Sequence, residues 1–243
     1  MNVNLWDFIQ FLSVCNYVRD EPTVECKGNT MKVCMMGYEE CTGVDLTLKC
    51  DESFGKTTLM KFHTGGVTAV IRGWGRGDIE FNEDSKTLVL EKTGDLHRRF
   101  QVPLYQTGTK DTCLERPAIN EMPYHFTISS KEYRKWLSQF QGFAEVILLE
   151  LDQESIKIKS SSGNLLLEKR LKKHEKNDKK RGFFDKLPQK TVFLKVKTRF
   201  LTDFLDLFTI DFPLLVMFDS GKPIRLSGEC GNLSIKYWIA PIV

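Results

Sequence analysis

Two stretches of this chain match each other without a gap. Residues 7–33 align with residues 132–158, and apolar and charged positions coincide along the alignment. The ends of the two halves also correspond, 96–102 with 233–239. The clearest matching pieces are 24–26 with 149–151 and 30–33 with 155–158. Self-similarity of this kind indicates one folding unit used twice, so it predicts an architecture and does not by itself point to an active site.

The chain is long enough for two domains. Its 243 residues would form two domains of about 120 residues, an ordinary size, and a hydrophobic content of 41% supplies a core for each. The net charge is only +3, so any surface that attracts nucleic acid must be local. The seven cysteines are scattered and form no CxxC pair. That usage suits a reducing compartment, and we expect neither a metal nor a cofactor.

The sequence gives no sign of a membrane segment. No stretch approaches the roughly 18–20 apolar residues that a membrane-spanning helix needs. The first residues lack the basic region and cleavage site of a signal peptide. We therefore expect a protein without membrane partners.

Each half is predicted to run helix, strands, helix, strands. In the first half the helices are 4–18 and 66–74, and the strands are 23–26, 31–35, 44–49, 78–82, 87–92 and 97–104, with Lys27-Gly28-Asn29 as a turn. In the second half Ser129-Ser130 caps a helix over 131–140, a second helix covers 198–208, and the strands are 145–151, 155–160, 164–172, 213–219, 223–227 and 233–240. Residues 105–122 are polar, turn-rich and aperiodic, as connectors are. The predicted fold class is α+β, with two similar domains, 1–104 and 123–243, whose helices form one layer on curved antiparallel sheet.

Several short strings imitate catalytic motifs. Gly55-Lys56-Thr57 looks like the end of a phosphate-binding loop, but that motif requires Gly where Cys50 stands. The glycines at 73–77 are spaced wrongly for a dinucleotide fingerprint and precede a predicted strand. A hydrolase built on Cys113 and His125 is a third possibility, although nothing in the sequence orients the pair. We therefore predict no catalytic residues and no enzyme.

The second half carries the most specific sequence pieces. The chain ends with Leu-Ser-Ile-Lys-Tyr-Trp-Ile-Ala-Pro-Ile-Val, residues 211–218 read Asp-Phe-Pro-Leu-Leu-Val-Met-Phe, and residues 197–204 read Lys-Thr-Arg-Phe-Leu-Thr-Asp-Phe. In the first half, Met36 precedes Val-Asp-Leu-Thr-Leu at 44–48. Together with the duplication, these pieces resemble the sliding clamps of the proliferating cell nuclear antigen (PCNA) family, in order along essentially the whole chain.

This resemblance implies the DNA clamp fold, in which helices line a concave inner face and antiparallel sheets lie outside. Three identical subunits would close into a ring by pairing edge strands, 97–104 of one with 164–172 of the next. The apolar run Leu165-Leu166-Leu167 supports the covering of the second edge. Helix-borne cations would contact phosphates of double-stranded DNA without reading its bases. The candidate DNA-binding residues are Arg72, Arg76, Lys131, Arg134, Lys135, Lys197 and Arg199.

The resemblance also implies that the ring tethers partners. A DNA polymerase, a clamp loader and other proteins with short clamp-interacting peptides would insert one aliphatic and two aromatic side chains into an apolar pocket. By position, the pocket residues are Met36, Cys41, Gly43, Pro213, Trp238, Ala240 and Pro241, with Leu114, Pro117 and Ile119 as a lid. The implied function is a polymerase processivity factor at the site of DNA replication, which is the nucleus in a eukaryote and the cytoplasm in an archaeon or a virus.

Two features depart from the family pattern. The first helix, 4–18, carries Asp7 and neither Lys nor Arg. Family members usually have lysines at this helix, so the central hole of the ring would be less positive there. Residues 169–190 hold ten Lys or Arg residues against three acidic ones; this segment contacts DNA, acts as a nuclear address or is a solvated loop. The alternative function is therefore a clamp-like subunit with a checkpoint or transcription role that does not encircle DNA as a homotrimer.

Overall fold

The structure is a computed structural model, and the chain divides into two compact units. The structure describes residues 2–37, 41–75, 78–83, 87–92, 97–105, 122–162, 165–172, 183–186, 188–208 and 210–242. The first unit comprises Met1–Arg116 and Cys230–Ile235, and the second comprises Pro117–Glu229 and Lys236–Val243. The main division falls inside the predicted connector 105–122. The short segment Cys230–Ile235 groups with the first unit, although the sequence had placed it in the second domain.

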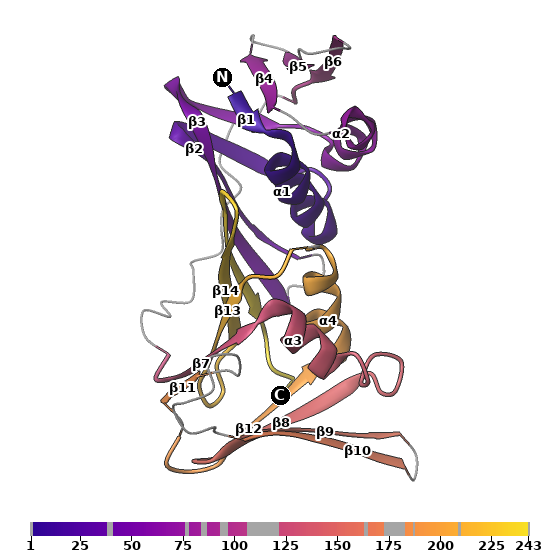
Figure 1. Cartoon of the computed structure of the whole chain (residues 1–243), viewed down its shortest axis with the longest axis vertical. Helices are drawn as coiled ribbons and strands as arrows, with labels where there is room; N and C mark the ends of the chain where they lie inside the picture. Colours follow the sequence, from indigo (N-terminus) through magenta and orange to yellow (C-terminus); the bar gives the residue numbers. More distant parts are fainter. Residues whose placement is uncertain are drawn as a thin grey trace. The chain divides into compact units, whose positions relative to one another are not determined.

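The described part of the first unit contains two α-helices and antiparallel strands (Figure 1). Its elements are β1 (Asn2–Asn4), α1 (Leu5–Val18), β2 (Thr23–Met36), β3 (Thr42–Lys61), α2 (Thr64–Ile71), a 3-10 turn at Arg72–Trp74, β4 (Asp78–Glu83), β5 (Thr87–Lys92) and β6 (Arg98–Pro103). Four of the strands form a sheet in the order β1-β4-β5-β6. Helices α1 and α2 pack against each other, and α1 also packs on β3.

Strand β2 differs from the predicted hairpin. The two predicted strands are the two in-register parts of one long β2, which pairs with β3 throughout. The register shifts on both sides of Gly28, whose φ is +56°. Glycine adopts this left-handed conformation without a steric penalty, so the predicted turn position is the place where the ladder changes register. The string Gly55-Lys56-Thr57 lies inside β3 and precedes no helix directly.

The second unit repeats the order of helix, strands, helix, strands. Its elements are β7 (Tyr124–Ser129), α3 (Ser130–Leu137), β8 (Val146–Leu151), β9 (Ser155–Ser162), β10 (Leu165–Lys172), β11 (Phe183–Lys186), β12 (Val192–Lys197), α4 (Thr198–Asp206), β13 (Pro213–Phe218), β14 (Ile224–Cys230) and β15 (Leu233–Ile239). One sheet has the order β10-β9-β8-β12, and a second ladder runs β11-β7-β13-β14-β15. Helix α3 packs against α4. Strands β1, β7, β11 and β12 are not among the predicted strands.

The two halves start their first helices in the same way. Asn4 Oδ1 accepts hydrogen bonds from the backbone N–H groups of Trp6 and Asp7, over 3.0 and 3.2 Å. Ser129 Oγ accepts one from the N–H of Glu132 over 3.2 Å. The gap-free alignment of the halves places Asn4 on Ser129. Both residue types are favoured at this position because a short side-chain oxygen satisfies helix N–H groups that have no partner within the helix.

Burial follows the same alignment. The aligned apolar side chains of both halves are buried: Phe8, Val24, Cys26, Met31 and Val33 in the first, and Tyr133, Leu149, Leu151, Ile156 and Ile158 in the second. In β12 and β15 buried residues alternate with more exposed ones, as the two-residue strand period predicts. Among the described residues, no helix is both long and apolar enough to cross a membrane.

Candidate nucleic-acid interface and partner-binding residues

The start of helix α3 is built around Asp211. Its carboxylate accepts hydrogen bonds from the hydroxyls of Ser129 and Ser130 and from the N–H of Lys131. Burial alone would raise the pKa of Asp211, but these donors outweigh burial and lower it. The positive end of the helix dipole also stabilises a carboxylate at a helix N-terminus. The arrangement fixes the direction of α3 and of the side chains that it presents to solvent.

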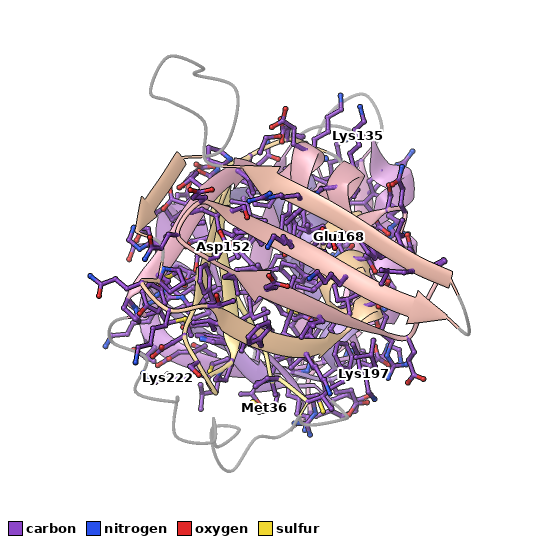
Figure 2. The ribbon with its side chains drawn as sticks, turned by 90° about the horizontal axis from the view of Figure 1, so that it is seen from below. Met36, Lys135, Asp152, Glu168, Lys197 and Lys222 are labelled. Atoms are coloured by element: carbon purple, nitrogen blue, oxygen red, sulfur yellow. The ribbon has the colours of Figure 1, made fainter. Side chains whose placement is uncertain are left out.

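Three of the predicted DNA-binding cations extend into solvent from α3 and α4. Lys131, Lys135 and Arg199 are exposed, and Lys197, just before α4, is half-buried. Figure 2 labels Lys135 and Lys197. Arg199 Cζ lies 5.0 Å from the centre of the Phe200 ring and Lys197 Nζ lies 5.6 Å from it. These cation–π contacts hold the two positive groups near the start of α4.

Arg134 contacts the C-terminal end of α4, unlike the exposed Lys131 and Lys135 on the same helix. Its guanidinium donates to the carbonyl oxygens of Leu205 and Phe208 over 2.5 and 2.6 Å, and Nε lies 3.5 Å from Asp206 Oδ1. The last carbonyls of a helix lack partners within the helix, and a cation suits the negative end of the dipole. Arg134 therefore ties α3 to the C-terminal end of α4.

The helices of the first unit carry far less charge. Helices α1 and α2 contain one charged residue between them, Asp7. Arg72 follows α2; it is exposed and donates to Ser13 Oγ of α1 over 3.4 Å. Arg76 lies outside the described residues. Of the cations predicted in this half, Arg72 alone is placed by the structure.

Asp7 does not contribute to the exposed face of α1. Its side chain is 5% exposed, and Oδ2 accepts hydrogen bonds from the side-chain and backbone nitrogens of Asn232 over 3.0 and 3.4 Å. Burial raises the pKa of Asp7, while the bonds from Asn232 oppose the rise. The expectation of a less positive helix therefore rests on the absence of Lys and Arg from α1, because Asp7 does not lie on its exposed face.

The partner-pocket residues of the first unit lie at the end of the β2–β3 hairpin. Met36 and Gly43 are directly opposite each other in the ladder. Met36 and Cys41 are half-buried, and Gly43 is buried. The structure thus brings these three residues to one end of one hairpin. The lid residues Leu114, Pro117 and Ile119 lie outside the described residues, as does Cys113.

In the second unit, Trp238 belongs to a row of side chains that crosses the sheet. Met217 is the ladder partner of both His125 and Arg225, and Arg225 Cζ lies 6.0 Å from the centre of the Trp238 ring. Trp238 is half-buried, and its buried Nε1 has no hydrogen-bond acceptor. His125 is a half-buried member of this row. The row combines an aromatic side chain, a thioether and a cation, a composition typical of protein-binding surfaces.

Pro213 is not brought to this row. It is exposed at the start of β13, where its ladder partner is Ser129. Met217 lies four residues further along β13, about 13 Å at the ordinary rise of a strand. Ala240 and Pro241, both half-buried, follow β15 directly. The cation–π contact gives Arg225 as a neighbour of Trp238, and the strand register places Met217 opposite Arg225.

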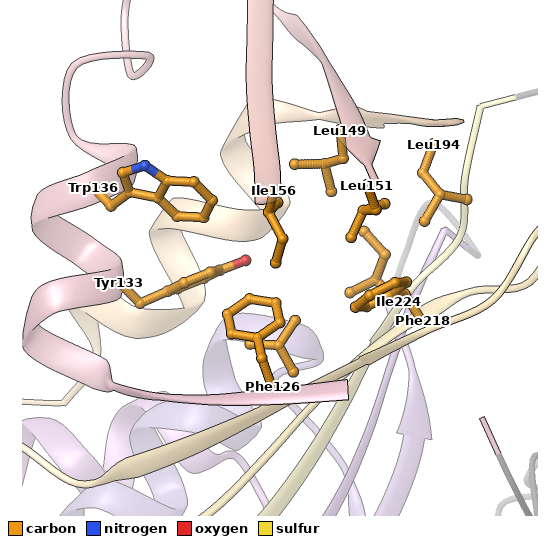
Figure 3. A pocket seen from close by; sticks show the side chains of 10 residues that line it. Phe126, Tyr133, Trp136, Leu149, Leu151, Ile156, Leu194, Phe218 and Ile224 are labelled. Atoms are coloured by element: carbon orange, nitrogen blue, oxygen red, sulfur yellow. The ribbon is translucent and has the colours of Figure 1, made fainter. Parts of the chain in front are cut away.

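A cavity inside the second unit is distinct from these residues. Tyr133 and Trp136 of α3 face it, and the other lining side chains are Phe126, Leu149, Leu151, Ile156, Leu194, Val216, Phe218 and Ile224 (Figure 3). Its volume of about 10 Å³ is near the minimum for one water molecule. It is a packing defect of an apolar core and cannot take a partner's side chain.

The chain resembles known proteins in structure and not in sequence. No family model matches the sequence, and no curated protein shows significant similarity to it. Solved structures match along the whole chain. PCNA from Entamoeba histolytica superposes with a TM-score of 0.83 at 11% identity, covering 99% of this chain and 96% of that one. The chain has the PCNA fold.

Two further structures bear this out. PCNA from Thermococcus kodakaraensis matches with a TM-score of 0.82 at 14% identity and covers 99% of both chains. PCNA from A. fulgidus, in a structure with the C-terminal region of FEN-1 bound, matches with a TM-score of 0.85 at 12% identity, covering 100% of this chain and 97% of that one. The predicted fold class, α+β with the architecture of a DNA clamp, is confirmed. At these identities the likeness establishes the fold alone.

In this PCNA-fold chain the two predicted edges end their sheets. Strand β6 is last in the order β1-β4-β5-β6, and β10 is first in the order β10-β9-β8-β12. Leu166 on β10 is 69% exposed. A large apolar side chain on a terminal strand is a liability unless another strand covers it.

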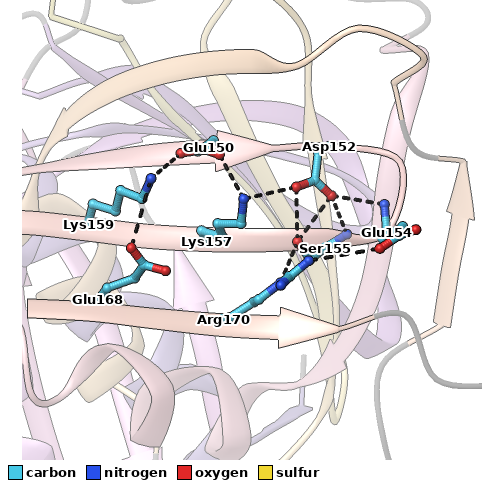
Figure 4. Close-up of polar contacts among 8 residues, drawn as sticks. All are labelled: Glu150, Asp152, Glu154, Ser155, Lys157, Lys159, Glu168 and Arg170. Carbon is cyan, nitrogen blue, oxygen red and sulfur yellow. Dashed lines mark hydrogen bonds and ion pairs between the residues drawn. The ribbon is translucent and has the colours of Figure 1, made fainter.

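The outward face of the β8-β9-β10 sheet carries a network of ion pairs (Figure 4). Glu150 accepts hydrogen bonds from both Lys157, over 2.8 Å, and Lys159. The hydrogen bond from Lys157 is the largest cause of a lowered pKa for Glu150, and the hydrogen bond from Lys159 is the next largest. Lys157 also lies 3.2 Å from Asp152. Burial would raise the pKa of Asp152, but bonds from the Glu154 N–H, Lys157 and Ser155 outweigh it and lower the pKa to about 2.

Strand β10 joins this network through two side chains. Arg170 Nε donates to Ser155 Oγ over 3.0 Å, and Glu168 lies 3.8 Å from Lys159. These contacts bridge from β10 to its neighbour β9 and add to the backbone ladder between them. They hold the terminal strand in register.

Proposed function

We propose that this chain is the subunit of a DNA sliding clamp, a processivity factor that encircles duplex DNA and tethers DNA polymerase and other replication or repair proteins. The observation that carries the proposal is the full-length match to PCNA structures, combined with exposed cations on α3 and α4. Binding, rather than catalysis, is the proposed activity.

Cations on helices suit a protein that slides. Lys131, Lys135 and Arg199 reach solvent from regular helices. Long cationic side chains contact phosphates, and phosphate contacts carry no sequence information. A surface of this kind gives affinity without a deep energy minimum at any one position along the DNA.

Ring closure would use the two terminal strands. Strand β6 of one copy would pair with β10 of the next, which would cover Leu166 and satisfy the free backbone groups of both strands. Because the contact is head-to-tail, it closes only at a fixed number of copies, three in this proposal. One of the similar structures is a PCNA2–PCNA3 complex from Sulfolobus tokodaii, with a TM-score of 0.81 at 13% identity. A mixed ring is therefore an outcome that the experiment must distinguish.

Partner proteins would bind through short apolar peptides. The structure of A. fulgidus PCNA with the C-terminal region of FEN-1 supports a peptide mode of binding for this fold. In this chain the residues proposed for it are those around Trp238 and the Met36–Gly43 end of the β2–β3 hairpin. A polymerase held in this way stays at high effective concentration near the primer end. A clamp loader would open and close the ring, at the site of replication.

In a second candidate function, the chain has the same fold but does not encircle the duplex. The neutral α1 and α2 helices favour a clamp-like subunit with a checkpoint or transcription role. Light scattering during size-exclusion chromatography separates the two. A homotrimer of 28.1-kDa chains that stimulates a polymerase on primed circular DNA supports the clamp. A persistent monomer, or a ring formed only with a different subunit, supports the second function.

A further inference from the structure

Helices α1 and α2 of the first unit contain no Lys, Arg or Glu. On α1 the residues that reach solvent at least in part include Trp6, Ile9 and Asn16, and on α2 they include Ala69 and Val70. Asp7 is buried against Asn232. Two described cations directly follow these helices: half-buried Arg19 after α1, and Arg72 after α2, whose guanidinium bonds to Ser13.

The helices of the second unit present a mixed but net positive face. Lys131 and Lys135 lie one turn apart on α3, so they are on the same side of the helix. Arg199 begins α4, and its neighbour Lys197 precedes the helix. The acidic residues of these helices are Glu132, Asp203 and Asp206, and the last lies 3.5 Å from Arg134. The exposed cations are therefore concentrated toward the N-terminal ends of α3 and α4 and along one side of α3.

We propose that the chain contacts DNA phosphates through the second unit alone, with Lys131, Lys135 and Arg199, while the α1–α2 face of the first unit borders the duplex without binding phosphate. This inference rests on the proposed clamp function. It differs from a uniformly basic inner wall, because half of the helices in each subunit contribute no phosphate contact. The number of counterions released on binding is then set by the second unit.

The salt dependence of DNA binding tests the inference. Fluorescence anisotropy with a labelled short duplex would give the Kd of the full-length chain between about 50 and 200 mM salt. Each phosphate contact contributes about 0.9 to the slope of log affinity against log salt. Lys131→Ala combined with Lys135→Ala should reduce that slope by about one for each cation removed. Arg199→Ala should reduce it by a similar amount.

Two variants of the first unit serve as matched comparisons. Arg72→Ala should leave the slope unchanged, although it also removes one exposed cation. Ala69→Lys, at an exposed position of α2, should increase the slope, because it adds a cation to a face that borders the duplex. Unfolding midpoints like that of the wild type would show that the substitutions act on binding and not on folding.

The outcomes separate the inference from the proposed function. If Arg72→Ala lowers the slope as much as the α3 and α4 variants do, phosphate contact is not confined to the second unit. If Ala69→Lys has no effect, the first-unit face does not border the duplex. Either result overturns the inference. If the unaltered chain shows no salt-dependent DNA binding, the proposed clamp function itself is overturned.

Discussion

Asn232 donates a hydrogen bond from Nδ2 to Oδ2 of Asp7 over 3.0 Å, and the two residues are 225 positions apart in the chain. The bond joins the first turn of α1 to the turn between β14 and β15. Gly231, with φ of +60°, lies directly beside the Asp7 carboxylate. The approach depends on glycine, because a Cβ at that position would collide with Asp7 Oδ1.

Gly231→Ala should destabilise the first unit through both its backbone and its contact with Asp7. Gly221 is a matched control, because its φ of +69° is similar but nothing lies within 4 Å of an added Cβ. Gly221→Ala should cost about 1 kcal/mol, the strain of a left-handed alanine. Gly231→Ala should cost about 1–3 kcal/mol more, because it displaces a buried hydrogen-bonded carboxylate. Urea unfolding measures both, and equal losses would contradict the contact.

Stability should fall as pH rises through the pKa of Asp7. That pKa is raised above the ordinary value of 3.8. Between the two values the folded chain binds more protons than the unfolded chain, so the free energy of unfolding decreases with increasing pH. Asp7→Asn keeps a side-chain oxygen that accepts a hydrogen bond from Asn232, but this side chain does not titrate. The free energy of unfolding of this variant should therefore decrease less between the two pKa values. An unaltered decline in Asp7→Asn would assign the effect to another group.

Arg134 and Lys135 are neighbours on α3 and should separate stability from DNA binding. Arg134→Ala removes the donors to the carbonyls of Leu205 and Phe208 and should cost about 2 kcal/mol of stability. Lys135→Ala should change stability by less than about 0.5 kcal/mol, as exposed positions do, while it weakens DNA binding. Thermal unfolding of the two variants is the measurement. A Lys135→Ala variant less stable than Arg134→Ala would reverse the assignment.

The network around Asp152 predicts a loss of stability in acid. The pKa of Asp152 is about 2 in the folded chain against an ordinary 3.8. The folded state therefore favours the carboxylate, and its contribution is present above about pH 4 and lost as the pH falls toward 2. Asp152→Asn should lose less stability over this interval than the wild type does. A urea titration at several acidic pH values tests this, and identical curves would exclude a contribution from Asp152.

Trp238→Ala should abolish binding of a short clamp-interacting peptide without unfolding the chain. Truncation of an aromatic anchor at an interface typically costs about 2 kcal/mol or more, at least a tenfold loss of affinity. Trp238→Phe is the control and should retain most of the affinity, because the Trp238 Nε1 has no acceptor to lose. Calorimetry that finds normal affinity for Trp238→Ala would remove this residue from the partner site.

Local sequence signals predicted the parts of the fold that depend on nearby residues. The Ser129 cap and the paired burial of Val24 with Leu149 follow from short-range patterns that repeat in the two halves. Strand β12, Val-Phe-Leu-Lys-Val-Lys, shows a similar alternation in its burial, so a signal for this unpredicted strand is present in the sequence. Helix and strand periods are visible along the chain because they depend on spacing alone.

The side-chain roles that depend on distant residues were not predictable in this way. Asp7 looked like a surface acid on a helix, because its partner Asn232 lies at the other end of the sequence. Arg134 looked like its neighbours Lys131 and Lys135, because only the packing of α4 on α3 turns its guanidinium toward carbonyl oxygens. Met217 was not predicted, because only the pairing of β13 with β14 places it opposite Arg225, the residue in contact with Trp238. In each case a tertiary contact decided between alternatives that the sequence left open.

The first unit includes Cys230–Ile235, so its completion has a timing consequence during synthesis. Helix α1 leaves the ribosome well before the donors for its Asp7 carboxylate, which follow 225 residues later in the chain. Until Asn232 emerges, the Asp7 carboxylate lacks the hydrogen bonds that it accepts in the folded unit. A nascent chain released before Asn232 would therefore carry an unfinished first unit and should be a preferred substrate for cellular proteases.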